Sequence, residues 1–164
     1  MSKTKTLELQ YQEFEQISDL SMEYQNLIES AKIAQAKAYA PYSNFKVGAA
    51  LLLEDQSVVL GNNQENAAYP SGLCAERVAF FAYGAQQHDS KIKALAVVAG
   101  SEQFDFKGVL SPCGACRQVM LEYEHLQNQA IPILLFSGKG SVILLNSLAD
   151  LLPFGFLCQD LKKN

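Results

Sequence analysis

Three of the four cysteines in this chain lie in two short clusters with the spacing of metal ligands. Cys74 is followed two residues later by Glu76, while Cys113 and Cys116 are separated by two residues in a segment that begins with Pro112. Three thiolates on zinc leave a fourth position open for water, which is the arrangement of a catalytic site. A carboxylate beside that position can move protons. These are the parts that a hydrolytic deamination of a nucleobase needs.

Each of these residues also has a structural interpretation. The cysteines could be buried thiols, because free cysteine is among the most buried residue types. Glu76 could be an exposed carboxylate that stabilises the first turn of a helix. However, Cys74 and Cys113 are both expected at helix starts, where the helix dipole favours a thiolate. Cys113 and Cys116 would face the same way on one helical turn. We therefore interpret the three cysteines as zinc ligands and Glu76 as the general acid and base.

Composition restricts the kind of protein and the kind of partner. The chain has 164 residues, 49% of them hydrophobic, and a net charge of −4, which predicts one globular domain with a hydrophobic core. No run of Lys and Arg is present, so a groove for nucleic acid is not expected. The first ten residues lack the apolar segment of a signal peptide, and no apolar run is long enough to span a membrane. We expect a cytoplasmic protein with reduced or metal-bound cysteines.

The hydrophobic pattern predicts helices and strands in alternation. Apolar residues recur at helical spacing over about residues 12–39, with a break or cap near Ser18 and Ser21. Strands are expected at Val47–Leu53, Ser57–Gly61, Ile92–Ala99, Ile131–Phe136 and Val142–Leu145, and helices at Cys74–Tyr83, Gly114–Tyr123 and, as a short turn, Leu148–Leu152. This order predicts an α/β fold with a mixed sheet covered by helices on both faces. The domain is expected to span residues 1–164, with a helical extension over about residues 1–30.

Three longer segments carry a resemblance to a known family. Tyr39–Leu51 reads YAPYSNFKVGAAL, Gly61–Arg77 reads GNNQENAAYPSGLCAER, and Ser111–Val119 reads SPCGACRQV. Together they closely resemble the homotetrameric cytidine deaminases, from about Ala31 to the segment that ends at Phe156. The resemblance implies a three-layer α/β/α cytidine-deaminase-like fold with a mixed five-stranded sheet. It also implies one Zn²⁺ per chain and conversion of cytidine and deoxycytidine to uridine and deoxyuridine, within pyrimidine salvage.

The resemblance also suggests roles for residues next to the zinc ligands. Arg77 would hydrogen-bond to the zinc thiolates and offset their negative charge, whereas on the sequence alone a surface salt bridge is the alternative. Glu76 would move protons between the attacking water, the N3 atom of cytosine and the leaving amino group. The backbone N–H of Ala75 would reach the O2 atom of the base.

The substrate-binding residues are likewise implied by the family. Asn63 and Glu65 would bind the sugar 3′-hydroxyl, with ordinary loop polarity as the alternative, and Phe45 would pack on the pyrimidine ring, with a core position as the alternative. Ala67 is placed in the same substrate-binding stretch. Tyr69 and Phe156 would enter the site of a neighbouring subunit, so that the tetramer completes each site. Phe154 is a second candidate for the C-terminal aromatic contact.

Two other functions fit parts of the pattern. A deaminase of the same fold that acts on a cytosine-containing antibiotic of the blasticidin S type would share both cysteine motifs, although the Asn63–Glu65 element favours a nucleoside. A non-catalytic protein with a closed four-cysteine zinc site would need Cys158 as the fourth ligand and would leave Glu76 without a role.

Overall fold

The computed structural model describes residues 2–87, 89–101, 103 and 110–157. Its strands are β1 (Gln12–Phe14), β2 (Lys46–Leu53), β3 (Val58–Asn62), β4 (Ile92–Gly100), β5 (Ile133–Phe136) and β6 (Val142–Leu145). Its α-helices are α1 (Met22–Ala36), α2 (Ala75–Ala85) and α3 (Gly114–Gln127), and short 3-10 helices cover Ile17–Asp19, Tyr69–Ser71 and Leu148–Leu151. The strands and helices predicted from residue 47 onward are confirmed, with shifts of a few residues at their ends.

The strands form one mixed sheet in the order β1-β6-β5-β4-β2-β3. The β4 and β5 strands run parallel, and every other neighbouring pair is antiparallel. A parallel pair needs a long crossover connection, and here that connection carries α3. The sheet has six strands instead of the five that the resemblance implied, because β1 pairs with β6 at one edge, with Gln12 opposite Leu144.

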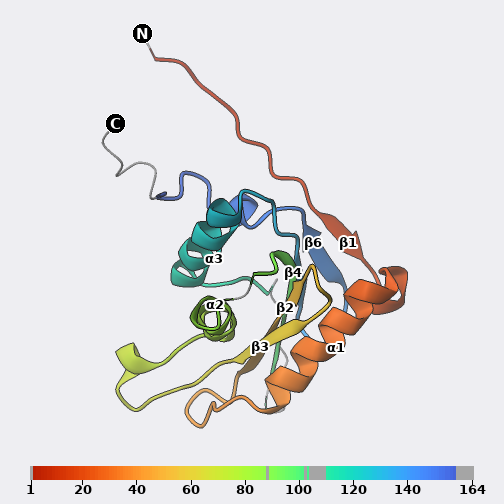
Figure 1. Ribbon diagram of the computed structural model, residues 1–164, viewed down its shortest axis with the longest axis vertical. Coiled ribbons are helices and arrows are strands. Elements are labelled where there is room, and N and C mark those ends of the chain that lie inside the picture. Colours follow the sequence, from red (N-terminus) through yellow and green to blue (C-terminus); the bar gives the residue numbers. More distant parts are fainter. Residues whose placement is uncertain (1, 88, 102, 104–109, 158–164) are drawn as a thin grey trace.

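Helices cover both faces of the sheet, as predicted (Figure 1). The α1 helix lies on one face, while α2 and α3 lie side by side on the other. One buried cluster joins the sheet to α2 and α3 and includes Phe80, Met120 and Leu135. A second cluster joins the sheet to α1 and includes Leu27 and Ile28. Within the described ranges, no helix is long and apolar enough to cross a membrane.

The N-terminal part differs from the helical extension expected over about residues 1–30. Ser21 caps α1 by accepting a hydrogen bond from the Tyr24 N–H at 3.4 Å, which agrees with the cap predicted there. Upstream of it, however, Gln12–Phe14 is a strand and residues 2–11 form no helix. The helical spacing of Phe14 and Ile17 is real, but both side chains pack against the α1 side of the sheet. Tertiary packing therefore overrides the local pattern.

Two glycines allow helices to lie unusually close to the hairpin formed by β2 and β3. A Cβ atom on Gly48 would lie 2.0 Å from the carbonyl oxygen of Ala31 in α1. A Cβ atom on Gly61 would lie 2.3 Å from the carbonyl oxygen of Ala75 and 2.4 Å from the backbone nitrogen of Ala79, both in α2. Real Cβ atoms do not come this close to backbone atoms, so the position of α2 depends on the missing side chain at Gly61.

A buried carboxylate organises the chain around the end of α3. Glu124 is 7% exposed. It accepts hydrogen bonds from the backbone N–H groups of Ile131 at 2.7 Å, Leu148 at 2.8 Å and Ala149 at 3.0 Å, and from the Ser147 hydroxyl at 2.6 Å. Donors that satisfy both carboxylate oxygens allow a charge to be buried without a cationic partner. Glu124 thus joins the end of α3 to the segments before β5 and after β6.

The glycine contact predicts a sharp effect of one added methyl group. Gly61→Ala should lower the free energy of unfolding by at least about 1–3 kcal/mol, because α2 must move away from β3. Thermal unfolding followed by circular dichroism measures the change. Gly114→Ala is the matched control, because a Cβ there meets no atom within 4 Å. Equal melting temperatures for both variants and the parent chain would contradict this account of the packing.

Candidate functional site

The structure brings the three predicted cysteines together from two helix starts. Cys74 is the N-cap residue of α2, Cys113 is the N-cap residue of α3, and Cys116 is in the first turn of α3. The Sγ atoms of Cys74 and Cys113 are 3.8 Å apart, and those of Cys113 and Cys116 are 3.4 Å apart. All three sulfurs lie within 4.8 Å of one another. They converge although 39 residues separate the first two in sequence.

These distances fit a shared metal ion. Tetrahedral coordination with Zn–S bonds of about 2.3 Å places two sulfurs roughly 3.8 Å apart, which is close to the spacing seen here. The cysteines differ in exposure, since Cys116 is buried, Cys74 is half-buried and Cys113 is exposed. An ion held between them would therefore be reachable from one side, as an open catalytic position requires.

The thiols of Cys74 and Cys116 have pKa values shifted in opposite directions. A hydrogen bond from the Cys116 thiol and another from Arg77 lower the pKa of Cys74 to about 5, although burial opposes this shift. The same hydrogen bond to Cys74, together with burial, raises the pKa of Cys116 well above its usual range. One thiolate and a retained proton are thus stable in this arrangement, and binding of a divalent cation would displace the proton.

Glu76 lies beside the sulfur cluster in the first turn of α2. Its side chain is 5% exposed and still lines the adjoining cavity. Burial raises the pKa of the Glu76 carboxyl to about 7, and the negative charge of Cys74 adds to this rise. A carboxyl group whose pKa is near neutrality can both accept and return a proton, which is the property of a general acid and base.

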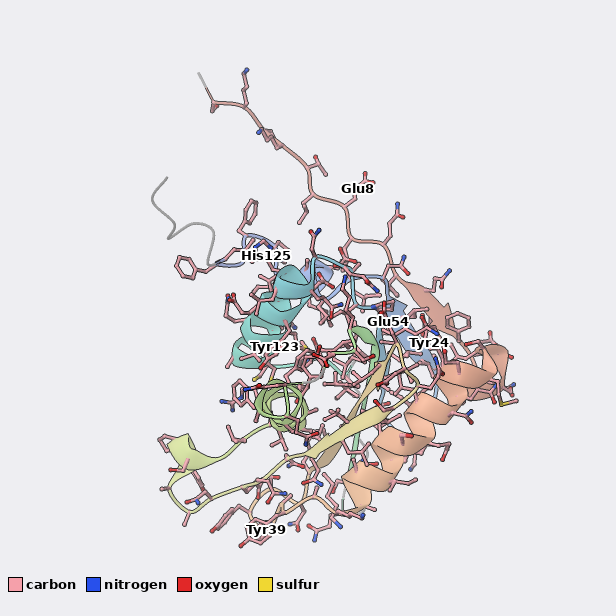
Figure 2. All side chains as sticks on the ribbon, viewed as in Figure 1. Glu8, Tyr24, Tyr39, Glu54, Tyr123 and His125 are labelled. Carbon is pink, nitrogen blue, oxygen red and sulfur yellow. The ribbon has the colours of Figure 1, made fainter. Side chains whose placement is uncertain are left out.

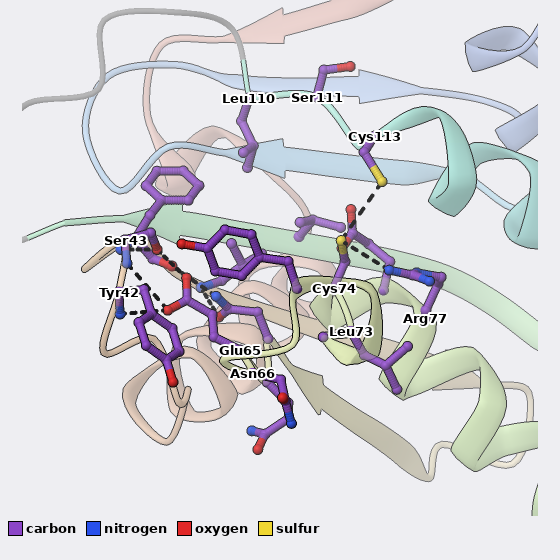
Figure 3. A pocket seen from close by; sticks show the side chains of 18 residues that line it. Tyr42, Ser43, Glu65, Asn66, Leu73, Cys74, Arg77, Leu110, Ser111 and Cys113 are labelled. Atoms are coloured by element: carbon purple, nitrogen blue, oxygen red, sulfur yellow. Dashed lines mark hydrogen bonds between the residues drawn. The ribbon is translucent and has the colours of Figure 1, made fainter.

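Arg77 contacts the sulfur cluster from the side of α2. Its Nη2 atom donates to the Sγ atom of Cys74 at 3.7 Å (Figure 3). Its Nε atom is buried and, among the described residues, has no hydrogen-bond partner. The guanidinium group is therefore held against the thiolate as the resemblance implied, and no acidic side chain in the described part of the chain pairs with it in a salt bridge.

Arg117 holds the loop that carries Cys113, and the sequence analysis did not identify it. Its guanidinium group donates to the carbonyl oxygen of Pro112 at 2.8 Å, to that of Leu151 at 2.9 Å and to the hydroxyl of Ser111 at 2.5 Å. These bonds tie the loop to the 3-10 helix that follows β6. An arginine directly after Cys116 was the available signal, but its partner at Leu151 is distant in sequence.

A cavity of about 640 Å³ opens next to the sulfur cluster. Cys74, Cys113 and Glu76 lie in its wall, and the rest of the lining is aromatic, aliphatic and polar, and includes Tyr42, Ser43, Phe45, Val47, Asn63, Glu65, Tyr69, Val97 and Leu110. Figure 3 shows Cys74 and Cys113 across the cavity from Tyr42, Ser43 and Glu65. An open cleft of this size with a few polar groups is typical of small-molecule sites.

Glu65 and Asn63 build the wall of the cavity through hydrogen bonds of their own. Glu65 accepts from the backbone N–H groups of Tyr42 at 2.8 Å and Ser43 at 3.3 Å and from the Ser43 hydroxyl. Burial alone would raise the pKa of Glu65, but these hydrogen bonds lower it below its usual value. Asn63 accepts from the Val47 N–H at 2.8 Å and donates to the Phe45 carbonyl oxygen at 2.9 Å. Both side chains therefore fix the segment that carries Phe45.

Three other predicted site residues differ in their relation to the cavity. Tyr69 lines the cavity, is 77% exposed and packs edge-on to Tyr42 with ring centroids 6.3 Å apart. Ala75 is buried between Cys74 and Glu76. Ala67 is exposed and does not line the cavity of its own chain.

The C-terminal aromatic residues do not line the cavity beside the sulfur cluster of their own chain. Phe156 is 58% exposed and Phe154 is fully exposed, and neither lines the cavity beside the sulfur cluster. The backbone of Phe156 is held by Gln118 in α3, whose side chain donates to the Phe156 carbonyl oxygen at 2.7 Å. Cys158, the candidate fourth ligand, lies outside the described residues.

Comparisons with known proteins agree with this geometry. A family model described as "Cytidine and deoxycytidylate deaminase zinc-binding region" matches residues 21–129. A cytidine deaminase of Sporosarcina psychrophila is 46% identical over 140 residues, which are 85% of this chain and 96% of that protein. The crystal structure of a cytidine deaminase from Burkholderia pseudomallei has a TM-score of 0.69 and 46% identity, and covers 80% of this chain and 97% of that one. A cytidine deaminase structure from Mycobacterium tuberculosis has a TM-score of 0.62 and 36% identity, with 83% and 98% covered.

The contacts of Arg117 predict a loss of metal retention. Arg117→Ala should release the Cys113 loop and weaken metal binding by the three thiols about 10–100-fold, as is usual when a group that orients a ligand is removed. Zinc transfer to a colorimetric chelator at 25 °C measures this effect. Gln118→Ala is the control, because it changes the adjacent residue of α3 but leaves the loop contacts intact. Equal rates of zinc loss in the two variants would contradict the role of Arg117.

Proposed function

This chain belongs to the cytidine deaminase family, and on that basis we propose that it is a zinc-dependent hydrolase of cytidine and deoxycytidine. The products are uridine or deoxyuridine and ammonia. The observation that carries the proposal is the convergence of three thiols with a buried carboxyl group at one end of a cavity. The proposed cofactor is one zinc ion per chain, held by Cys74, Cys113 and Cys116, and the proposed place of action is the cytoplasm.

Glu76 is the proposed proton carrier of the reaction. Zinc, when bound, supplies a water molecule whose pKa is lowered toward neutrality. Glu76 takes a proton from the attacking water and passes it to N3 of the base as a new bond forms at C4. It then carries the proton of the new C4 hydroxyl group to the exocyclic amino group, so that the C4–N bond breaks, ammonia leaves and the carbonyl group of uracil remains. Its burial beside Cys74 supports this role, because a carboxyl with a raised pKa exchanges protons readily near pH 7.

The cavity wall supports a pyrimidine nucleoside as the substrate. Phe45, Val47 and Val97 offer an apolar surface to a flat base, and the backbone N–H of Ala75 is proposed to reach its O2 atom. Glu65, whose lowered pKa keeps it ionised at neutral pH, supports binding of a sugar hydroxyl together with Asn63. A negative carboxylate at this end also disfavours a phosphorylated sugar, which favours nucleosides over nucleotides.

We further propose that the active form is a homotetramer in which subunits complete one another's sites. The largely exposed side chains of Tyr69 and Phe156 support this, because large apolar side chains are stabilised when a partner covers them. The backbone of Phe156 is fixed by Gln118, and its ring does not line the cavity of its own chain. Such a residue can contribute to a neighbour's site but not to its own, and Ala67 is proposed to lie near the same junction.

The role of Glu76 leads to a direct test of the function. Glu76→Gln should retain zinc but lower kcat for cytidine about 10²–10⁴-fold, because an amide cannot carry the proton. Loss of ultraviolet absorbance from cytidine gives the rate, and metal analysis of the same sample gives the zinc content. Cys158→Ser should change neither quantity. Full activity in Glu76→Gln would refute the mechanism, and loss of zinc in Cys158→Ser would favour a closed four-cysteine site.

Completion of one site by another subunit predicts rescue by mixing. Phe156→Ala chains keep Glu76 but lack the aromatic ring, whereas Glu76→Gln chains keep the ring but lack the proton carrier. Oligomers formed by co-expression of the two should be several-fold more active than the sum of the separate variants. Co-expression with a chain carrying both substitutions is the control. The absence of rescue, with mixed oligomers verified by differential tags, would exclude a contribution of Phe156 between subunits.

A further inference from the structure

The segment before β1 is extended and leaves apolar side chains exposed. Residues 2–11 run away from the body of the domain, and Figures 1 and 2 show this segment, with Glu8 on it, leading toward the N-terminus. Leu7, Leu9 and Tyr11 are 67%, 53% and 55% exposed. They occupy alternate positions, which is the period of a β-strand with one apolar face. We call residues 3–15 the N-terminal arm. All of it lies outside the matched family region, residues 21–129.

The apolar face of the arm borders a groove on the α3 side of the sheet. Leu9 and Tyr11 line a hollow of about 410 Å³ together with apolar side chains of β5, β6 and the following 3-10 helix, among them Leu135, Ile143, Leu145 and Leu151. Those four side chains also belong to or pack on the buried cluster under α2 and α3. The core thus continues into a groove that the described part of the chain does not fill.

The arm also continues an edge strand. β1 is the last strand of the sheet, and among the residues that the structure describes it pairs with β6 alone, so that its outer side has no strand beside it there. An exposed edge strand with apolar side chains is a template for another strand. We propose that a second copy of this chain covers it, with the two arms paired antiparallel about a two-fold axis at Leu9. The two six-stranded sheets then form one continuous sheet across the interface.

The charges of the arm select this partner and this register. With Leu9 on the axis, each Leu7 lies opposite Tyr11 of the second copy. On the same face, each Lys5 lies opposite Glu13 of the second copy. Each Lys3 lies beyond these paired residues, on the side of Glu15, which is at a bend just past the end of β1. Apolar residues therefore meet at the centre, and opposite charges meet on both sides of it. Within the described ranges, neither lysine forms a salt bridge in its own chain.

Neighbouring registers are less favourable. An axis at Glu8 would place the two copies of that carboxylate opposite each other, and an axis at Gln10 would place Leu7 opposite Glu13. An axis at Tyr11 would place Leu9 opposite Glu13. An axis between two residues would place Leu9 opposite Glu8 or Gln10, because a one-residue slip puts the apolar residues of the two copies on different faces. The pattern therefore favours the axis at Leu9. A strand that is complementary to itself in this way gives an isologous interface, in which each copy contributes the same surface.

A cysteine placed on the axis tests the pairing directly. Residues directly opposite each other in an antiparallel pair have Cα atoms about 4.5–5.5 Å apart, which a disulfide can span. Leu9→Cys should therefore form a covalent dimer under oxidised glutathione, at least tenfold faster than Leu7→Cys, whose position faces Tyr11 instead of itself. The unchanged chain gives the background from its own cysteines. Equal rates at the two positions, or no dimer above that background, would overturn the proposal.

Charge reversal tests the register without oxidation. Lys5→Glu alone or Glu13→Lys alone places like charges opposite each other twice per interface, which should raise the dissociation constant of this pairing roughly tenfold. The variant with both substitutions should recover it. Sedimentation velocity measures the assembled mass, and Ser141→Ala is the control because Ser141 bonds to Glu13 within one chain. If both single variants and the double variant assemble alike, the pairing is refuted. Neither experiment depends on deaminase activity.

Discussion

The convergence of three sulfur atoms on one point is the constraint that the rest of the structure serves. Two helices must begin within a few ångströms of each other, and their first turns must face the same cavity. The α2 helix reaches this position because Gly61 lets it lie against β3. The α3 helix reaches it because Arg117 joins the preceding loop, at the carbonyl oxygen of Pro112, to the carbonyl oxygen of Leu151. The sulfur cluster is thus positioned by two separate sets of contacts, one for α2 and one for α3.

Two polar residues of the cavity wall order the segment that carries Phe45. Glu65 and Asn63 form hydrogen bonds to backbone groups of residues 42–47. These bonds fix the segment before any ligand arrives, which reduces the entropy lost on binding. In the proposed function, a sugar hydroxyl would meet acceptors that already lie in one orientation.

Much of this architecture could be predicted because its signals are local. Cys74, Glu76, Cys113 and Cys116 were identified from spacing, and the strands after residue 46 from runs of apolar residues. Predictions failed where distant partners decide the structure. The β1 strand forms because Gln12–Phe14 pairs with β6, which lies about 130 residues away in the sequence. The role of Arg117 depends on the carbonyl oxygen of Leu151, which lies 34 residues further along the chain. A single sequence does not reveal such pairings.

The hydrogen bonds of Glu124 hold the two ends of the β5–β6 hairpin together. The backbone at Ile131, just before β5, and at Leu148, just after β6, bonds to the same carboxylate. Both ends of the β5–β6 hairpin are therefore fixed at one place in the domain, and changes in the length of its turn at Gly138–Gly140 need not move the loop that carries Cys113. Insertions or a short fused peptide at that turn should be absorbed locally. The turn is thus a natural point at which related proteins can diverge in length and at which a reporter tag could be introduced.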